Sequence, residues 1–276
     1  IGNAAEIDRP INYFTGYRPA VENTILPLGW YEVGLEFSRD IALKKGKTYP
    51  AIGYNLYFVS GLDNSGFSSL NFVKRGYQKR FEMINANNIA YALRLDYKFN
   101  DKDYVGFNIY AGNGTGNRPK NDFTLPAWLV VSNAHFNIDK KNWRVTGYFM
   151  TAYLQNSEKL SAANRNISNN LGVKRTPVAK IAMGAYIEAG YNVLNFFVEK
   201  ETQQKLFVFG RFDYYDSMFR TEGNITDNPR YERFVYTGGI NYFPIKDIVL
   251  KTHFSHKKLG SNETENTFLL GFGFSF

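Results

Sequence analysis

The stretch "NIAYALRLDYKF" (88–99) alternates apolar residues with small or charged ones at a period of two. Leu93 and Leu95 fall in the apolar set, whereas Arg94 and Asp96 fall in the polar set. This period predicts a β-strand with one apolar face and one polar face.

The residues after this strand predict that it forms a β-hairpin with the next segment. The polar turn "NDKD" (100–103) is followed by "YVGFNIYAG" (104–112), in which the alternation resumes. Two alternating segments joined by a short polar turn predict a β-hairpin. The same unit recurs around "DKKN" (139–142) and "PIKD" (244–247). Aromatic or large aliphatic residues flank these turns, as is typical of the interfacial girdle of a membrane barrel.

Eleven segments of this kind run through the chain, and short turns alternate with long polar loops. That alternation is typical of outer-membrane barrels, which have short periplasmic turns and long extracellular loops. We therefore predict an all-β fold, a transmembrane antiparallel β-barrel that forms a single domain over residues 1–276. The predicted strands are 30–38, 49–60, 88–99, 104–112, 128–138, 143–154, 179–193, 205–215, 233–243, 248–256 and 266–276.

Composition excludes several other classes of protein. The 276 residues include no cysteine, which excludes disulfides and thiolate metal sites, and no apolar run reaches the roughly 18 residues of a membrane helix. The net charge is +8, but Lys and Arg are scattered and no recognition motif accompanies them, so we expect no nucleic-acid partner. No cofactor motif and no metal-ligand spacing occurs, and we expect no cofactor and no metal.

We also predict that the chain is not an enzyme. A lipid-hydrolysing barrel would need an outward Ser and His close together near the membrane surface. His256 has a suitable position, but the sequence places no Ser beside it.

The N-terminal residues 1–28 leave more than one interpretation open. Bacterial single-chain barrels have even strand numbers, and counting back from a periplasmic C-terminus makes 1–28 an extracellular segment. The chain is then the C-terminal part of a longer barrel, or "INYFTGYR" (11–18) supplies an irregular twelfth strand.

Two regions resemble a known family. "FVSGLDNSGFSSLNFVKRGYQKR" (58–80), together with "FGRFDYYDSMF" (209–219) and "RFVYTGGINYFPIKDIVLKTHFSHK" (233–257), resembles porins of the phosphate-selective type. The resemblance implies a barrel of about sixteen strands, commonly trimeric, that passes phosphate, other small anions or unrelated solutes. The abundance of Asn, Lys and Tyr resembles outer-membrane proteins of Gram-negative groups such as Bacteroidota.

The final stretch "NTFLLGFGFSF" (266–276) carries an aromatic or aliphatic residue at every second position. It resembles the C-terminal signal that the barrel-assembly machinery reads; the alternative is the edge strand of a β-sandwich. The predicted assembly signal is Phe268, Leu270, Phe272, Phe274 and Phe276.

If the apolar faces meet lipid, the opposite faces line the lumen. Seven cations and five anions fall on that face, which predicts a weak preference for anions. The alternative is that the charges pair along the wall, as the spacing of Arg94 with Asp96 and of Arg211 with Asp213 allows. The predicted pore-lining residues are Arg94, Lys98, Arg144, Lys180, Arg211, Arg233, Lys251, Glu32, Glu36, Asp96, Glu188 and Asp213.

The sequence thus predicts a porin in the outer membrane of a Gram-negative bacterium, through which small hydrophilic solutes diffuse passively. The alternative is a non-conducting structural or accessory barrel subunit of a larger outer-membrane secretion or transport assembly. Expected partners are outer-membrane lipid, the barrel-assembly machinery, and copies of the same chain in a trimer or a larger membrane complex.

Overall fold

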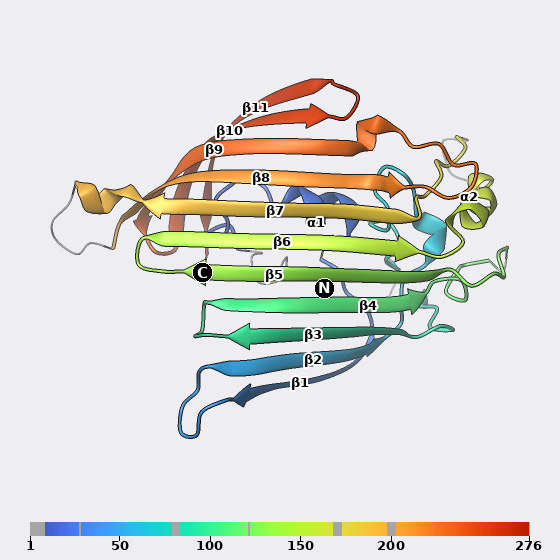
Figure 1. The fold of residues 1–276 in the computed structure, drawn as a ribbon, viewed down its shortest axis with the longest axis horizontal. Coiled ribbons are helices and arrows are strands. Elements are labelled where there is room, and N and C mark those ends of the chain that lie inside the picture. The colour runs from blue at the N-terminus through green and yellow to red at the C-terminus, as the bar shows by residue number, and fades with distance from the viewer. Residues whose placement is uncertain are drawn as a thin grey trace.

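The computed structural model describes residues 9–27, 29–78, 83–120, 122–167, 173–197 and 203–275. Eleven strands form one antiparallel sheet, in which each strand pairs with its neighbours in chain order (Figure 1). The strands are β1 (Gly34–Ala42), β2 (Ala51–Val59), β3 (Ala90–Lys98), β4 (Tyr104–Asn113), β5 (Trp128–Asp139), β6 (Trp143–Leu154), β7 (Ile181–Asn192), β8 (Lys205–Arg220), β9 (Glu232–Ile245), β10 (Ile248–Leu259) and β11 (Thr264–Phe274).

Helices are few and short. Two α-helices, α1 (Ala20–Ile25) and α2 (Ser157–Arg165), accompany the single-turn 3-10 helices η1 (Asn64–Gly66), η3 (Val193–Phe196) and η4 (Pro229–Tyr231). No helix in the described part of the chain has the length and apolarity needed to cross a membrane.

All eleven predicted strands are present, with shifted bounds in places. The first begins at Gly34 rather than at residue 30, and β8 continues to Arg220. Trp30 lies before the strand, and its indole N–H donates to the Glu32 carboxylate at 2.8 Å. The helix α2 lies in a connection that the sequence predicts to be irregular.

The sheet is open over the described residues: the predicted all-β antiparallel fold is confirmed, and its closure into a barrel stays a prediction. The strand β1 pairs only with β2, and β11 pairs only with β10. Figure 1 shows β1 and β11 at opposite ends of the sheet. Eleven strands in this order leave one hydrogen-bonding edge unpaired on each outer strand.

The outer face of the sheet carries large apolar side chains that are exposed to the surroundings. Leu35 in β1 is 65% exposed and Leu270 in β11 is 78% exposed, and every strand between them contributes at least one exposed apolar residue. Exposed apolar surface of this extent marks contact with lipid or protein. The period of two predicted from the sequence is confirmed, because the alternate residues are buried on the inner face.

The inner face holds two apolar clusters. The larger includes Leu129, Met150 and Leu160 and lies beneath the long loops, which we call the long-loop end of the sheet. The smaller contains Phe14, Phe207, Phe209, Phe243 and Val249 and lies toward the opposite, short-turn end.

Residues 9–27, called here the inner segment, lie against the inner face, behind the sheet in the view of Figure 1. The prediction of an irregular strand at 11–18 is therefore wrong, because the inner segment forms bends followed by α1. Its extracellular placement stays a prediction. Pro10 and Pro19 bracket the stretch and supply no backbone N–H, which disfavours strand pairing. Residues 1–8 and 28 lie outside the described part of the chain.

Candidate functional site

A buried charge cluster on β7 and β8 holds the inner segment. The Arg211 guanidinium binds both oxygens of Asp213, at 2.7 Å and 2.9 Å, in a bidentate ion pair. The Glu188 carboxylate lies 3.8 Å from the same guanidinium. The side chains of Arg211 and Asp213 are 0% exposed, so no open aqueous passage lies beside them.

Further hydrogen bonds of the cluster go to the inner segment. The Phe14 backbone N–H donates to Glu188 at 3.0 Å, and the Ala20 N–H donates to Asp213 at 3.1 Å. Arg211 donates to the Thr15 hydroxyl at 2.6 Å. Arg211 and Asp213 thus have several hydrogen-bond partners each, and Glu188 combines one hydrogen bond with the nearby guanidinium; pairing of this kind is the condition under which buried ions are tolerated.

Backbone carbonyls of the inner segment receive donors from neighbouring strands. The Lys251 ammonium in β10 donates to Tyr13 O at 2.6 Å and to Thr15 O at 2.8 Å. Arg144 in β6 donates to Ile11 O at 2.9 Å, and Asn241 in β9 donates to Phe14 O at 2.8 Å. Side chains of five consecutive strands, β6 to β10, therefore hold this segment, a span that requires a curled sheet.

Aromatic packing also holds the inner segment in place. The Phe14 ring lies between the rings of Phe207 and Phe209, with centroids 5.1 Å and 5.2 Å away. Gly190 leaves room for it, because a Cβ there would lie 2.3 Å from the tip of the Phe14 ring. In the same way a Cβ at Gly184 would lie 2.6 Å from Val21 of α1.

The predicted charges on β3 also face inward and are paired. Arg94 contacts Asp96 at 2.6 Å, and the His135 ring contacts the other oxygen of Asp96 at 3.0 Å. Lys98 contacts Asp40 at 2.7 Å. The local ion pairs allowed by the sequence spacing are confirmed here and at Arg211 with Asp213.

The two predicted carboxylates near β1 serve local structure. Glu32 accepts hydrogen bonds from the Gly61 N–H at 2.7 Å and from Trp30, which fastens the first long loop to β1. Glu36 accepts from the Asn55 amide at 2.8 Å across the β1–β2 pair.

The last two predicted cations lie at the long-loop end. Lys180 contacts Glu222 at 3.0 Å, and Arg233 stacks over the Tyr215 ring at 5.5 Å. Neither reaches the charge cluster around Arg211, so the twelve predicted residues form several separate groups and no single ring.

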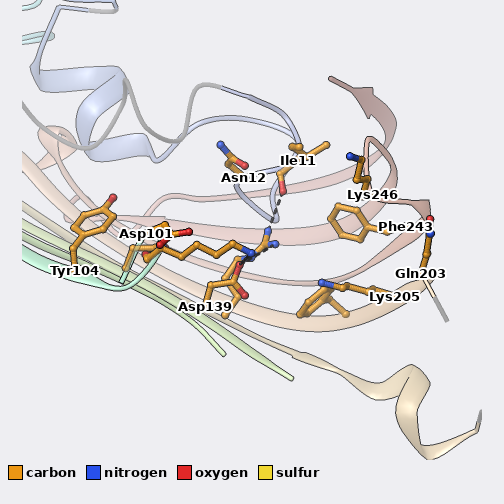
Figure 2. Close-up of a pocket in the computed structure, with 13 residues that line it drawn as sticks. Ile11, Asn12, Asp101, Tyr104, Asp139, Gln203, Lys205, Phe243 and Lys246 are labelled. Carbon is orange, nitrogen blue, oxygen red and sulfur yellow. Dashed lines mark hydrogen bonds and ion pairs between the residues drawn. The ribbon is translucent and has the colours of Figure 1, made fainter. Parts of the chain in front are cut away.

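A cavity of about 440 Å³ opens at the short-turn end of the inner face, and we call it the short-turn cavity. Figure 2 shows Asp101 and Asp139 on one side and Lys205 and Lys246 on the other. Ile11 of the inner segment lies between the two sides. Phe207 and Phe243 supply an apolar wall.

A second cavity, of about 890 Å³, lies among the long loops and is lined by polar and aromatic residues that include Asp63 and Arg175. Burial raises the pKa of the Asp63 carboxyl, although hydrogen bonds from Ser65 oppose the rise. Among the described residues no three His, Asp or Glu side chains gather as a metal site would require.

The predicted assembly signal lies on the outer face. Phe268, Leu270, Phe272 and Phe274 are 71%, 78%, 73% and 52% exposed, so they share one face as predicted. Phe276 lies outside the described residues.

Sequence reasoning missed the inner segment as the main partner of the inward charges. It also missed His253, which accepts the Gly16 N–H at 2.9 Å. The available indication was the aromatic content of "INYFTGY" (11–17), which is too apolar for an ordinary exposed segment.

Comparisons with known proteins identify no family. No protein-family model matches the chain. An uncharacterized protein of Aquifex aeolicus (strain VF5) is 25% identical over 266 residues, which cover 92% of this chain and 55% of that protein. The chain thus spans about half the length of this relative. The resemblance to phosphate-selective porins stays a prediction.

Among solved structures, LpxR from Salmonella typhimurium is similar with a TM-score of 0.29 and 9% identity, over 88% of both chains. LpxR is an outer-membrane enzyme, and this finding contradicts the prediction that the chain is not an enzyme. That prediction is withdrawn. At such a TM-score the likeness transfers no reaction and no catalytic residue to this chain.

Proposed function

We propose that the chain forms the wall of an outer-membrane β-barrel and that its inner segment closes a diffusion channel for small hydrophilic solutes. The exposed apolar outer face and the polar inner face supply the two environments that such a wall separates. The alternation of short turns and long loops agrees with this placement.

The observation that carries the proposal is the binding of the inner segment across strands β6 to β10. The inward charges that the sequence assigns to a pore lining donate to the backbone of this segment or accept from it. The lumen-facing side of the sheet is therefore filled at this level, and conduction requires the segment to move.

The way the segment is held favours a removable closure. Its described bonds to the wall all involve a side chain, and its described backbone-to-backbone bonds, such as Asn23 N–H to Pro19 O, stay within the segment. No ladder of a strand pair has to break for it to leave. Once it leaves, Lys251 and Arg144 lose carbonyl acceptors and face the lumen, which gives a weak preference for anions.

The filled inner face also favours a second candidate, a non-conducting structural or accessory subunit of a larger outer-membrane assembly. In that case the inner segment is a permanent part of the core. Outer-membrane lipid, the barrel-assembly machinery and a trimeric or larger membrane complex belong to both candidates as proposed partners.

A reversible tether separates the two candidates. Val21→Cys with Gly184→Cys places two thiols where the native Val21 side chain already meets the Gly184 position, in a chain with no other cysteine. We expect single-channel steps in planar bilayers for the untethered chain and for the reduced variant, and their loss on oxidation. Val21→Cys alone, which leaves Gly184 without a Cβ, is the control and should conduct under both conditions.

Each other outcome has a definite meaning. Steps that persist in the oxidised double variant show that the segment does not close the channel. Silence of the wild type and of the reduced variant supports the non-conducting subunit. A reversal potential that favours cations overturns the anion preference.

A further inference from the structure

We propose that the short-turn cavity is a binding site for a small organic anion with an aromatic body, such as an aromatic monocarboxylate. Its volume of about 440 Å³ lies within the range of small-molecule pockets, roughly 300 to 1,000 Å³. The cavity combines cations that lack close carboxylate partners with an aromatic wall, and those two features define the ligand class.

The charge of the described lining is positive. Among the lining residues that the structure describes, Lys102, Arg144, Lys205 and Lys246 accompany two carboxylates, those of Asp101 and Asp139. Asp139 lies 3.9 Å from Lys102 and 3.8 Å from Arg144, distances too long for a hydrogen bond to either cation.

Lys205 and Lys246, on the side of the cavity away from Asp139, have the least negative charge near them. Within the described part of the chain, the one ion pair of Lys246 is with Asp247, at 4.0 Å, and its side chain is 84% exposed. Lys205 has no ion pair among the described residues. Figure 2 places both lysines beside Phe243, so an anionic group that enters there meets positive charge at the edge of the apolar wall.

The apolar wall is rigid and aromatic. The rings of Phe207 and Phe243 meet edge to face with centroids 5.9 Å apart, and both residues are at most 4% exposed. Lys205 is the direct cross-strand partner of Phe243, which puts its side chain on the same face. A carboxylate bound to Lys205 therefore carries its ring against Phe243.

Arg144 supplies a further donor at the back of the cavity. Its guanidinium stacks on Phe14 and Phe207, 5.5 Å from each centroid, and donates one hydrogen bond to Ile11 O. A guanidinium has five N–H donors, and stacking holds its plane in a fixed orientation. Its free donors can bind the oxygens of a carboxylate that reaches past the two lysines.

These features discriminate among ligands. An inorganic anion leaves the aromatic wall unused, and a neutral aromatic molecule leaves the cations without a counter-charge. The inference does not rest on the proposed channel, because binding is measured directly and a failure of conduction leaves it unaffected.

The test is calorimetric titration of the full chain in a non-ionic detergent with benzoate, with benzamide as the neutral isostere and inorganic phosphate as the ring-free anion. We expect saturable one-to-one binding of benzoate, and affinities at least about tenfold lower for the other two probes. Lys205→Gln removes an exposed cation without disturbing the fold and should weaken benzoate binding at least about fivefold. Lys44→Gln, on another short turn outside the cavity, is the matched control and should change nothing.

Four results would overturn the inference. The first is the absence of saturable benzoate binding. The second is equal binding of benzamide, which shows partition of the ring alone. The third is equal binding of phosphate, which shows that the aromatic wall does not contribute. The fourth is an unchanged affinity in Lys205→Gln, which shows that this cation does not bind the carboxylate.

Discussion

Single residues explain why the inner face tolerates so many buried charges. Arg211 is fully buried, yet Asp213 binds it through two hydrogen bonds and Thr15 takes a third. Removing one partner of a buried pair typically costs about 3 to 5 kcal/mol, because the other charge is left unpaired. The inner segment therefore stabilises the charges as much as they hold the segment.

Gly190 gives the sharpest test at this scale. A Cβ there would lie 2.3 Å from the Phe14 ring, which cannot swing aside because Phe207 and Phe209 enclose it. Gly190→Ala should weaken docking of the inner segment by about 1 to 3 kcal/mol, the usual cost of overpacking. We expect faster chymotrypsin cleavage after Phe14 or Tyr17, measured by mass spectrometry of the fragments.

The matched control is Gly210→Ala on the adjacent strand. There the nearest atom to an added Cβ is 4.0 Å away, so the substitution meets no obstacle. Equal cleavage rates in the two variants would show that contact at Gly190 does not position the segment.

At the scale of elements, α2 depends on a loop far away in sequence. Its N-cap residue Asn156 makes no side-chain cap hydrogen bond. Instead Glu222, from the loop after β8, accepts from the Ser157 hydroxyl at 3.2 Å and the Glu158 N–H at 3.4 Å. A carboxylate at this end also interacts favourably with the helix dipole.

This arrangement makes α2 sensitive to pH. Burial opposes ionisation of Glu222, but the hydrogen bond from Lys180 outweighs it together with the other contacts and lowers the pKa below the ordinary value of 4.5. A depressed folded-state pKa gives stability that is present above pH 4.5 and is lost as the pH falls through the folded-state pKa. We expect amide exchange in α2, corrected for the intrinsic rate, to be faster at about pH 3.5 than at pH 6.

Glu222→Gln is the control for this prediction, because the amide does not titrate. Its α2 exchange, corrected in the same way, should differ little between the two pH values. A pH response as large as that of the wild type would place the titrating group elsewhere.

The strands could be predicted from the sequence because their signature is local. Each strand displays its two faces at every second residue, and pairing with chain neighbours adds no further choice. The helix α2 could not be predicted in the same way, since its capping carboxylate stands 65 residues after Ser157 and makes no local capping box.

At the scale of the whole molecule, the direction of the inward charges was predictable and their partners were not. Periodicity places Lys251 and Arg144 on the inner face, but the groups that they bind are carbonyls of Tyr13 and Ile11. Every residue has a carbonyl, so no residue type marks the acceptor. An open pore and a filled one therefore share the same wall sequence, and only the position of residues 9–27 distinguishes them.

The membrane placement itself has a test within one strand. Ile240, in the middle of β9, and Ile245, at its short-turn end, are 45% and 47% exposed. If the outer face met only water, Arg at either position would cost the same. In a bilayer the cost depends on depth: about 2 to 4 kcal/mol at the midplane and roughly 0 to 1 kcal/mol near the interface.

We therefore expect Ile240→Arg to lower the free energy of unfolding by about 2 to 4 kcal/mol and Ile245→Arg to lower it by at most about 1 kcal/mol. The measurement is urea unfolding of the chain folded into lipid vesicles. Because the two side chains have the same type and nearly the same exposed fraction, any difference reports depth in the bilayer and not burial in the protein. Equal losses in the two variants would show that lipid does not cover the outer face.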